Sequence, residues 1–318
     1  LIRDPGIFDK LPGVKNVFFD KTGTLTNGVF RILKWDTEGL GDRDLGAILA
    51  IEKKSDHPIA RAIVSRLAGM DLPAPEVTGF EHIYTKGVSA EAWGSVYTIT
   101  SGGASAPAAN EINELITSTI TVHKDGEPIS EIMLGDSLKE DAKFAVRELA
   151  GMGYGVFIVS GDKGENVKQV AERINVPREN IFFGETPEGK SEIIARHGRS
   201  MMIGDGLNDA PALASADVGV AIQGSVGESM KVSDAYILNN DLFTILDLIG
   251  LGTAARATAK RNIVLSISYN SIAGAFALAG YITPLAAAVL MPAVSLLLLG
   301  SALMGTAARA GDKRRAAA

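Results

Sequence analysis

The segment Asp20–Thr26, with the sequence Asp-Lys-Thr-Gly-Thr-Leu-Thr, directly follows the apolar residues Val17–Phe19. Such an apolar run predicts a strand that is buried on both faces of a parallel sheet. The strand delivers Asp20 at its carboxyl end, the edge at which open α/β sheets bind ligands. A carboxylate there can attack phosphorus, while Lys21, Gly23 and the threonine hydroxyls surround a phosphoryl group with charge and hydrogen-bond donors. We therefore expect Asp20 to form an aspartyl phosphate; an ordinary polar turn after a strand is the alternative.

Composition limits the kind of protein. The chain has 318 residues, enough for two domains, and its net charge of −6 gives no indication of a nucleic-acid partner. It contains no cysteine, which excludes disulfides and thiolate metal sites within this chain. No charged residue lies between Asn262 and Met304, whereas the region before Asn262 has an ordinary mixture of charged, polar and apolar residues. No signal-peptide pattern precedes that region, and we expect the chain to be the carboxyl-terminal part of a longer polypeptide.

The order of predicted elements indicates an α/β fold. From Lys139 onward, helices alternate with short apolar strands, which predicts a doubly wound parallel sheet. We expect helices at 139–151, 166–174, 190–197 and 210–214, and strands at 156–159, 181–183, 201–203, 218–222 and 235–237. The intervening segment 27–132 has helical spacing within Asp44–Ala68 and short strands at 77–80, 90–99 and 120–123. It predicts an inserted α+β lobe with a hinge near Leu134–Asp136.

Three later segments end strands at the same edge as Asp20. The hydroxyl and backbone amides of Ser160–Asp162 can hold phosphate oxygens, and Lys190 opens a helix that offers a fixed cation. The segment Gly204–Asp209 places two acids and an amide between glycines, which suits Mg²⁺. The first two signals are weak singly because each is common in surface turns. The third is strong, since these polar residues have no packing role.

Together these motifs resemble those of P-type ATPases, which have the haloacid-dehalogenase-like fold, and the resemblance covers nearly the whole chain. It implies that Asp20 is phosphorylated and that Asp20, the Thr22 carbonyl and Asp205 hold Mg²⁺. The catalytic residues that it implies are Asp20, Lys21, Thr22, Ser160, Gly161, Asp162, Lys190, Asn208 and Asp209. Many family members have threonine where this chain has Ser160.

Thr22 distinguishes a pump from a phosphatase. In the phosphatase relatives this position is an acid/base aspartate, whereas threonine cannot deprotonate water near neutral pH. In the pump family a Thr-Gly-Glu loop on an actuator domain activates water, and this chain has no such sequence. That domain is expected upstream or on another chain. A membrane-tethered phosphatase and a non-catalytic membrane subunit are the alternatives, disfavoured by Thr22, the inserted lobe and the complete phosphoryl site.

The inserted lobe carries a candidate nucleotide site. Its Ser-Asp-His-Pro sequence, Ser55–Pro58, resembles the Ser-Glu-His-Pro signature of the heavy-metal-transporting subgroup. A histidine beside a proline-fixed turn can stack on a purine, and a nearby glutamate can accept from its exocyclic amine; a capping Ser55 with a surface histidine is the alternative. The ATP-binding residues implied are Glu52, His57, Pro58 and Gly87. Thr85 stands where the subgroup has its first loop glycine, so we expect modest ATP affinity.

The uncharged region predicts two transmembrane helices, Asn262–Tyr281 and Pro284–Leu303, each about twenty residues long. Basic residues flank both outer ends, which places these ends and the catalytic domains in the cytoplasm. A buried helical hairpin is the alternative. The basic residues that flank the two predicted helices are Lys260, Arg261, Arg309, Lys313, Arg314 and Arg315.

Polar and sulfur-containing side chains within the two spans indicate a transported metal. Tyr269 and Asn270 in the first span, and Met291 and Ser295 in the second, resemble features of copper(I)-transporting members. A thioether suits Cu(I), and the acidic residue of zinc-type members is missing. We expect ATP-driven export of Cu(I), with a Zn²⁺-type pump as the alternative; a membrane methionine used only for packing is common.

These interpretations divide the chain into a phosphorylation domain (1–26 and 133–250), a nucleotide-binding domain (27–132), two transmembrane helices (251–308) and a basic cytoplasmic tail (309–318). The expected protein is a multi-pass membrane ATPase that uses ATP and Mg²⁺. The partners implied are the upstream membrane and actuator portion, the lipid bilayer and a soluble metal donor, with no nucleic acid.

Overall fold

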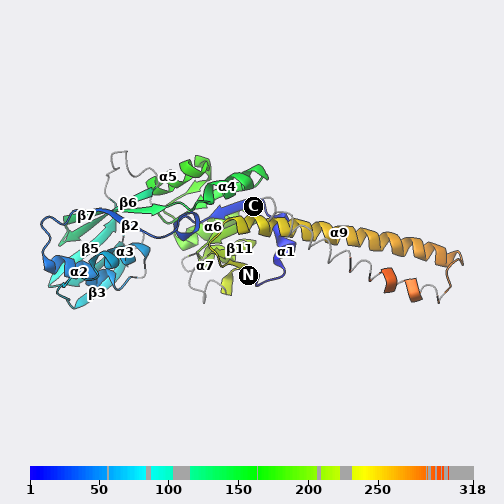
Figure 1. Cartoon of the computed structure of the whole chain (residues 1–318), viewed down its shortest axis with the longest axis horizontal. Helices are drawn as coiled ribbons and strands as arrows, with labels where there is room; N and C mark the ends of the chain where they lie inside the picture. The colour runs from blue at the N-terminus through cyan, green and yellow to red at the C-terminus, as the bar shows by residue number, and fades with distance from the viewer. Residues whose placement is uncertain are drawn as a thin grey trace.

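The computed structural model describes residues 1–55, 57–83, 87–102, 115–162, 164–205, 209–222 and 231–283, together with 285, 288–290, 292–294, 296 and 300. Two six-stranded sheets form two lobes, and the long helix α9 projects away from one of them (Figure 1).

The first sheet has the strand order β12-β11-β10-β1-β8-β9, and neighbouring strands run parallel. Its strands are β1 (Asn16–Phe19), β8 (Gly155–Val159), β9 (Ile181–Phe182), β10 (Ser200–Gly204), β11 (Val218–Ile222) and β12 (Ala235–Ile237). In β1, Phe19 is in register with Ile203 of β10 and with Ile158 of β8. The loops that follow these three strands therefore begin at one edge of the sheet, and the predicted parallel α/β sheet is confirmed.

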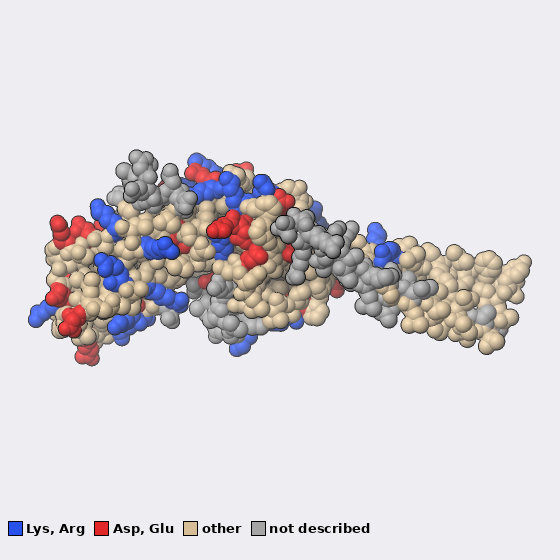
Figure 2. Space-filling model, viewed as in Figure 1, with Lys and Arg blue, Asp and Glu red and all other residues tan. Residues whose placement is uncertain are grey.

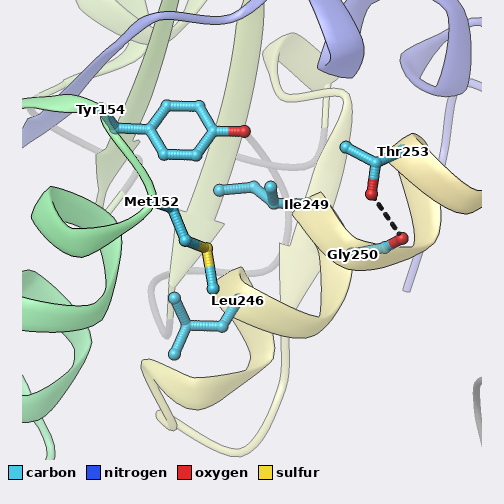
Figure 3. A pocket seen from close by; sticks show the side chains of 6 residues that line it. All are labelled: Met152, Tyr154, Leu246, Ile249, Gly250 and Thr253. Carbon is cyan, nitrogen blue, oxygen red and sulfur yellow. Dashed lines mark hydrogen bonds between the residues drawn. The ribbon is translucent and has the colours of Figure 1, made fainter.

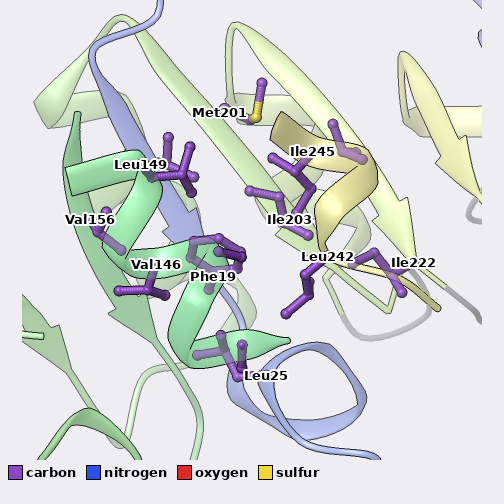
Figure 4. Close-up of a cluster of buried hydrophobic side chains, with 14 of the residues drawn as sticks. Phe19, Leu25, Val146, Leu149, Val156, Met201, Ile203, Ile222, Leu242 and Ile245 are labelled. Atoms are coloured by element: carbon purple, nitrogen blue, oxygen red, sulfur yellow. The ribbon is translucent and has the colours of Figure 1, made fainter. Parts of the chain in front are cut away.

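Helices cover both faces of this sheet because successive strand residues point to opposite sides. Phe19 packs in a core with α4, α5 and the start of α9 (Figure 4). Phe18 packs in a second core with α6 and α7. The helices are α1 (Ile7–Lys10), α4 (Ala142–Gly151), α5 (Gly164–Ile174), α6 (Pro187–His197), α7 (Ala210–Ser215) and α9 (Phe243–Leu278), with a short 3-10 turn at Leu11–Gly13.

The second sheet is antiparallel, with the order β2-β7-β6-β5-β4-β3, and its strands lie between β1 and β8 in the chain. Its elements are β2 (Arg31–Trp35), α2 (Asp42–Glu52), α3 (Pro58–Leu67), β3 (Val77–Ile83), β4 (Gly87–Ala92), β5 (Ser95–Ser101), β6 (Leu115–Lys124) and β7 (Glu127–Ser137). This arrangement confirms an inserted α+β lobe.

Two details of this lobe differ from the sequence-based expectation. Residues 90–99 form a hairpin rather than one strand, because Trp93 and Gly94 both have positive φ angles, of 57° and 76°. Leu134–Asp136, where a hinge is predicted, lie within the long strand β7; Leu134 and Gly135 pair with both β2 and β6, and Asp136 pairs with β6.

Helix α9 has a buried first part and an exposed outer part. Leu242, just before the helix, and Ile245 pack in the core of the first lobe, whereas Ile263 and Leu278 are 59% and 93% exposed. In Figure 2 charged side chains are spread over the lobes, and the projecting end of α9 is tan.

The two predicted transmembrane helices are not shown by the part of the chain that the structure describes. Among the residues that the structure describes, no helix combines the length and apolarity needed to cross a membrane. The predicted span Asn262–Tyr281 begins within the outer part of α9, which ends at Leu278. The predicted second span lies largely outside the described residues.

Candidate active site

Asp20 lies at the carboxyl end of β1, at the start of the loop predicted to hold a phosphoryl group. Its backbone N–H continues the sheet by donating to the carbonyl of Ile203 at 2.9 Å. The chain then turns through Gly23, whose φ of 76° is a left-handed conformation that favours glycine. The N–H of Thr26 closes the turn on the carbonyl of Lys21 at 3.1 Å.

Lys190 joins two carboxylates across this edge. Its ammonium lies 2.6 Å from an Asp20 oxygen and 2.7 Å from an Asp209 oxygen, and all three side chains are buried. The helix that carries the lysine, α6, begins at Pro187, and the hydroxyl of Thr186 accepts from the N–H of Gly189 at 2.9 Å. This cap fixes the first turn of α6, from which Lys190 reaches Asp20.

Burial and mutual charge interactions shift the pKa values of Asp20 and Lys190. Burial and the neighbouring Asp209 raise the pKa of Asp20 to about 6, although Lys190 acts in the opposite direction. Burial alone would lower the pKa of Lys190, but the two carboxylates outweigh it and raise that pKa. Near neutral pH the lysine is therefore a fixed cation, and Asp20 is a carboxylate that can act as a nucleophile.

A second ion pair connects the loop after β1 to the loop after β8. Lys21 is buried and pairs with Asp162, and the hydroxyl of Thr22 donates to the same carboxylate at 3.4 Å. Burial opposes ionisation of Asp162, but Lys21 outweighs it, so the pKa of this carboxyl is lowered. The N–H of Asp162 donates to Ser160 at 3.2 Å. The two loops are thus held together by charge.

These groups line one cleft of about 230 Å³. The lining residues are Asp20, Thr22, His57, Pro58, Ser160, Gly161, Asp162, Glu185, Pro187, Lys190, Asp205 and Asp209. Seven of them are predicted catalytic residues. Of the other two, Lys21 does not line the cleft but pairs with Asp162, which does, and Asn208 lies outside the described residues. Sequence reasoning missed Glu185 and Pro187; their only signal was their position just before the helix of Lys190.

His57 and Pro58 reach this cleft from the other lobe. The ring Nδ1 of His57 accepts from the N–H of Ile59 at 3.3 Å, which caps α3. Burial lowers the pKa of His57, and Asp162 acts in the opposite direction. The histidine predicted to bind the purine therefore lines the same cleft as Asp20 and Lys190 in this structure.

The donors around the Gly23 turn fit Mg²⁺. A β-carbon placed on Gly23 would lie 3.7 Å from that of Asp205, so this carboxylate faces the turn between Asp20 and Thr26. The described residues include no group of three His, Cys, Asp or Glu side chains placed around one metal position. Mg²⁺ commonly takes one or two carboxylates and completes its shell with phosphate and water, so Asp20, Asp205 and the Thr22 carbonyl suit it.

The other predicted ligands are not brought to this cleft. Gly87 has a φ of 141°, and a β-carbon there would lie 1.8 Å from the carbonyl oxygen of Ile99, so only glycine fits. Tyr269 and Asn270 lie on the outer part of α9, where the Asn270 amide donates to Ser266 at 3.5 Å. Their predicted partners in metal binding, Met291 and Ser295, lie outside the described residues, as does Thr85.

A second cavity, of about 310 Å³, is separate from the cleft. It lies between the turn after α4 and one side of α9 (Figure 3). Its lining residues are Met152, Tyr154, Leu246, Ile249, Gly250 and Thr253. With only the Tyr154 phenol able to titrate among them, it lacks the charged groups that phosphoryl transfer needs.

Glu52 gives a testable pH dependence. It ends α2, is 4% exposed, and burial raises its carboxyl pKa from 4.5 to about 7. The folded chain therefore binds this proton more tightly than the unfolded chain, and stability falls as pH rises from about 4.5 to 7. In Glu52→Gln, we expect the free energy of unfolding to fall by about 3 kcal/mol less than in the unmodified chain over this rise in pH. Urea unfolding of both proteins at pH 5 and pH 7.5 measures it; parallel pH dependences would contradict the assignment.

The sequence of this chain is similar to those of known proteins. Residues 14–217 match the haloacid dehalogenase-like hydrolase family. Copper-exporting P-type ATPase B of Archaeoglobus fulgidus is 30% identical over 312 residues, which is 94% of this chain and 44% of the relative. The chain spans less than half the length of such curated relatives.

Solved structures agree. The catalytic domain of the CPx-ATPase CopB-B is 30% identical with a TM-score of 0.66, over 78% of this chain and 94% of that one. A zinc-transporting PIB-type ATPase is 26% identical with a TM-score of 0.66, over 96% of this chain and 52% of that one. The loop after β1, the buried lysine and the inserted lobe thus occur in a chain that belongs to the haloacid dehalogenase-like hydrolase family, in its branch of heavy-metal P-type ATPases.

Proposed function

We propose that this chain is the catalytic and carboxyl-terminal part of an ATP-driven Cu(I) pump that works through an aspartyl phosphate on Asp20. The observation that carries the proposal is the buried ammonium of Lys190, which lies 2.6 Å and 2.7 Å from the Asp20 and Asp209 carboxylates. A structural ion pair needs one carboxylate. A lysine that balances two at a strand end suits a site that must also accept a phosphoryl group.

The chemistry follows from this arrangement. An oxygen of Asp20 attacks the γ-phosphorus of ATP, the bond from that phosphorus to its bridging oxygen breaks, and ADP leaves with the electron pair. Lys190 and the amides of the Ser160–Asp162 loop stabilise the charge on the phosphoryl oxygens. Bound Mg²⁺, held by Asp20, Asp205 and the Thr22 carbonyl, would supply further positive charge there.

Thr22 supports a pump over a phosphatase. Its hydroxyl donates to Asp162, and its neutral side chain cannot take a proton from water near neutral pH. The aspartyl phosphate is therefore long-lived until another group activates water. We assign that step to an actuator portion upstream of this chain.

The outer part of α9 supports a membrane location. Its exposed apolar side chains begin just after Lys260 and Arg261, which suit the cytoplasmic interface. We propose that residues 262–281 and 284–303 cross the bilayer beside upstream helices, with both lobes in the cytoplasm. Tyr269, Asn270, Met291 and Ser295 would contribute to the transport site, and a soluble protein would deliver the metal.

The choice of metal is tested in the pump that joins this chain to its upstream part. We expect Cu(I) and Ag(I) to stimulate ATP hydrolysis, and Met291→Leu, which conserves volume, to weaken that stimulation at least about tenfold because the thioether is lost. Met304→Leu is the matched control. Stimulation of the unmodified pump by Zn²⁺ or Co²⁺ but by neither Cu(I) nor Ag(I) would overturn the copper assignment.

A further inference from the structure

A path of contacts leads from the phosphoryl loop to the start of α9, away from the cleft. The backbone N–H of Lys139 donates to the carbonyl of Leu25 at 3.0 Å, and the preceding residue, Leu138, forms a β-bridge with Thr26. The side chain of Lys139 extends to the segment just before α9, where its ammonium donates to the side-chain oxygen of Asn240. One residue therefore contacts both the loop and the segment that begins the helix.

Burial of Lys139 disfavours the charged form of its side chain. Lys139 is 5% exposed, and burial lowers its pKa to about 8, with Asp141 and Asp241 acting in the opposite direction. A buried ammonium is costly unless it is hydrogen-bonded, so the bond to Asn240 cannot be broken without penalty. Loss of this contact would leave the buried ammonium without its acceptor.

The first turn of α9 is fixed by the same short segment of chain. A carboxylate oxygen of Asp141 accepts from the N–H of Leu242 at 2.6 Å. The rings of Phe144 and Phe243 lie 5.1 Å apart. Leu25 and Leu242 also belong to one core, visible in Figure 4. Residues 139–144 thus contact the beginning of α9 and the segment just before it, and the backbone of Lys139 is also hydrogen-bonded to Leu25 in the loop after β1.

We propose that Lys139 is a positioning residue that transmits the state of the Asp20 loop to α9. This inference rests on the proposed aspartyl phosphate. A phosphoryl group on Asp20 needs space and donors within the turn that ends at Leu25. When that turn shifts, the backbone of Lys139 shifts with it, and its ammonium pulls on Asn240. The start of α9 then moves too, since otherwise a buried cation loses its acceptor.

The test uses the full chain in detergent, with beryllium fluoride and Mg²⁺ as a stand-in for the phosphoryl group. Fluorine NMR reports binding, and hydrogen exchange with mass spectrometry reports on residues 243–252. In the unmodified chain we expect binding to change exchange there by on the order of tenfold. In Lys139→Met the analogue should still bind, but the change should fall below about twofold.

Two further variants make the result specific. Lys143→Met removes an exposed lysine from the first turn of α4 and should behave like the unmodified chain. Asn240→Gly removes the acceptor at a position whose φ of 53° glycine tolerates, and it should behave like Lys139→Met. An equal response of α9 in Lys139→Met and the unmodified chain, or no response in either despite binding, would overturn the inference. Failure of the unmodified chain to bind the analogue would instead overturn the aspartyl phosphate, and this inference with it.

Discussion

Asp20→Asn is expected to lower phosphoenzyme formation from ATP by at least about 10³-fold, the scale of losing a covalent nucleophile. The asparagine keeps the shape of the side chain, and its carbonyl oxygen can still accept from Lys190, so the fold should survive. An amide, however, has no oxygen that can form a stable bond to phosphorus. Acid-quenched incorporation of radioactive γ-phosphate, followed by release with hydroxylamine, measures the effect.

The matched control is Asp9→Asn, an exposed acid on α1. It should incorporate phosphate as the unmodified chain does, because its carboxylate is outside the cleft. Hydroxylamine-sensitive incorporation by the Asp20→Asn variant at the normal level would show that another residue is phosphorylated.

Lys190→Met should cost about 3–5 kcal/mol of folding stability near pH 8, since it leaves the Asp20 and Asp209 carboxylates buried without a cation. The loss has a defined pH dependence. Burial already raises the pKa of both carboxyls, and removal of Lys190 raises them further. The folded variant then holds protons that the unfolded chain releases, so the deficit grows as pH rises and shrinks toward pH 5.

Urea unfolding at pH 5 and pH 8 measures this deficit. Lys168→Met is the control, because Lys168 forms an exposed pair with Glu165 at 3.4 Å. Such a pair is worth about 0–1 kcal/mol. If Lys190→Met costs no more than this control at pH 8, the lysine does not neutralise the two carboxylates in solution.

The sequence alone determined the parallel sheet and the composition of its reactive edge. Val17–Phe19 are consecutive apolar residues, and only a strand covered on both faces buries all three. The carboxyl ends of parallel strands meet at one edge, so Asp20, Ser160 and Asp205 were expected together, and the structure brings them to one cleft. Local patterns suffice where the feature depends on period and on strand direction.

The tertiary structure decided which charges meet. Two lysines and several acids converge on the edge, and spacing does not reveal that Lys21 pairs with Asp162 while Lys190 holds Asp20 and Asp209. The approach of His57 to the same cleft depends on how the inserted lobe rests on the first. β7 was missed because its polar and apolar residues do not alternate regularly, and β2 and β6 hold it from both sides. These features arise from contacts between residues far apart in the chain, whose energies depend on packing and burial rather than on local sequence.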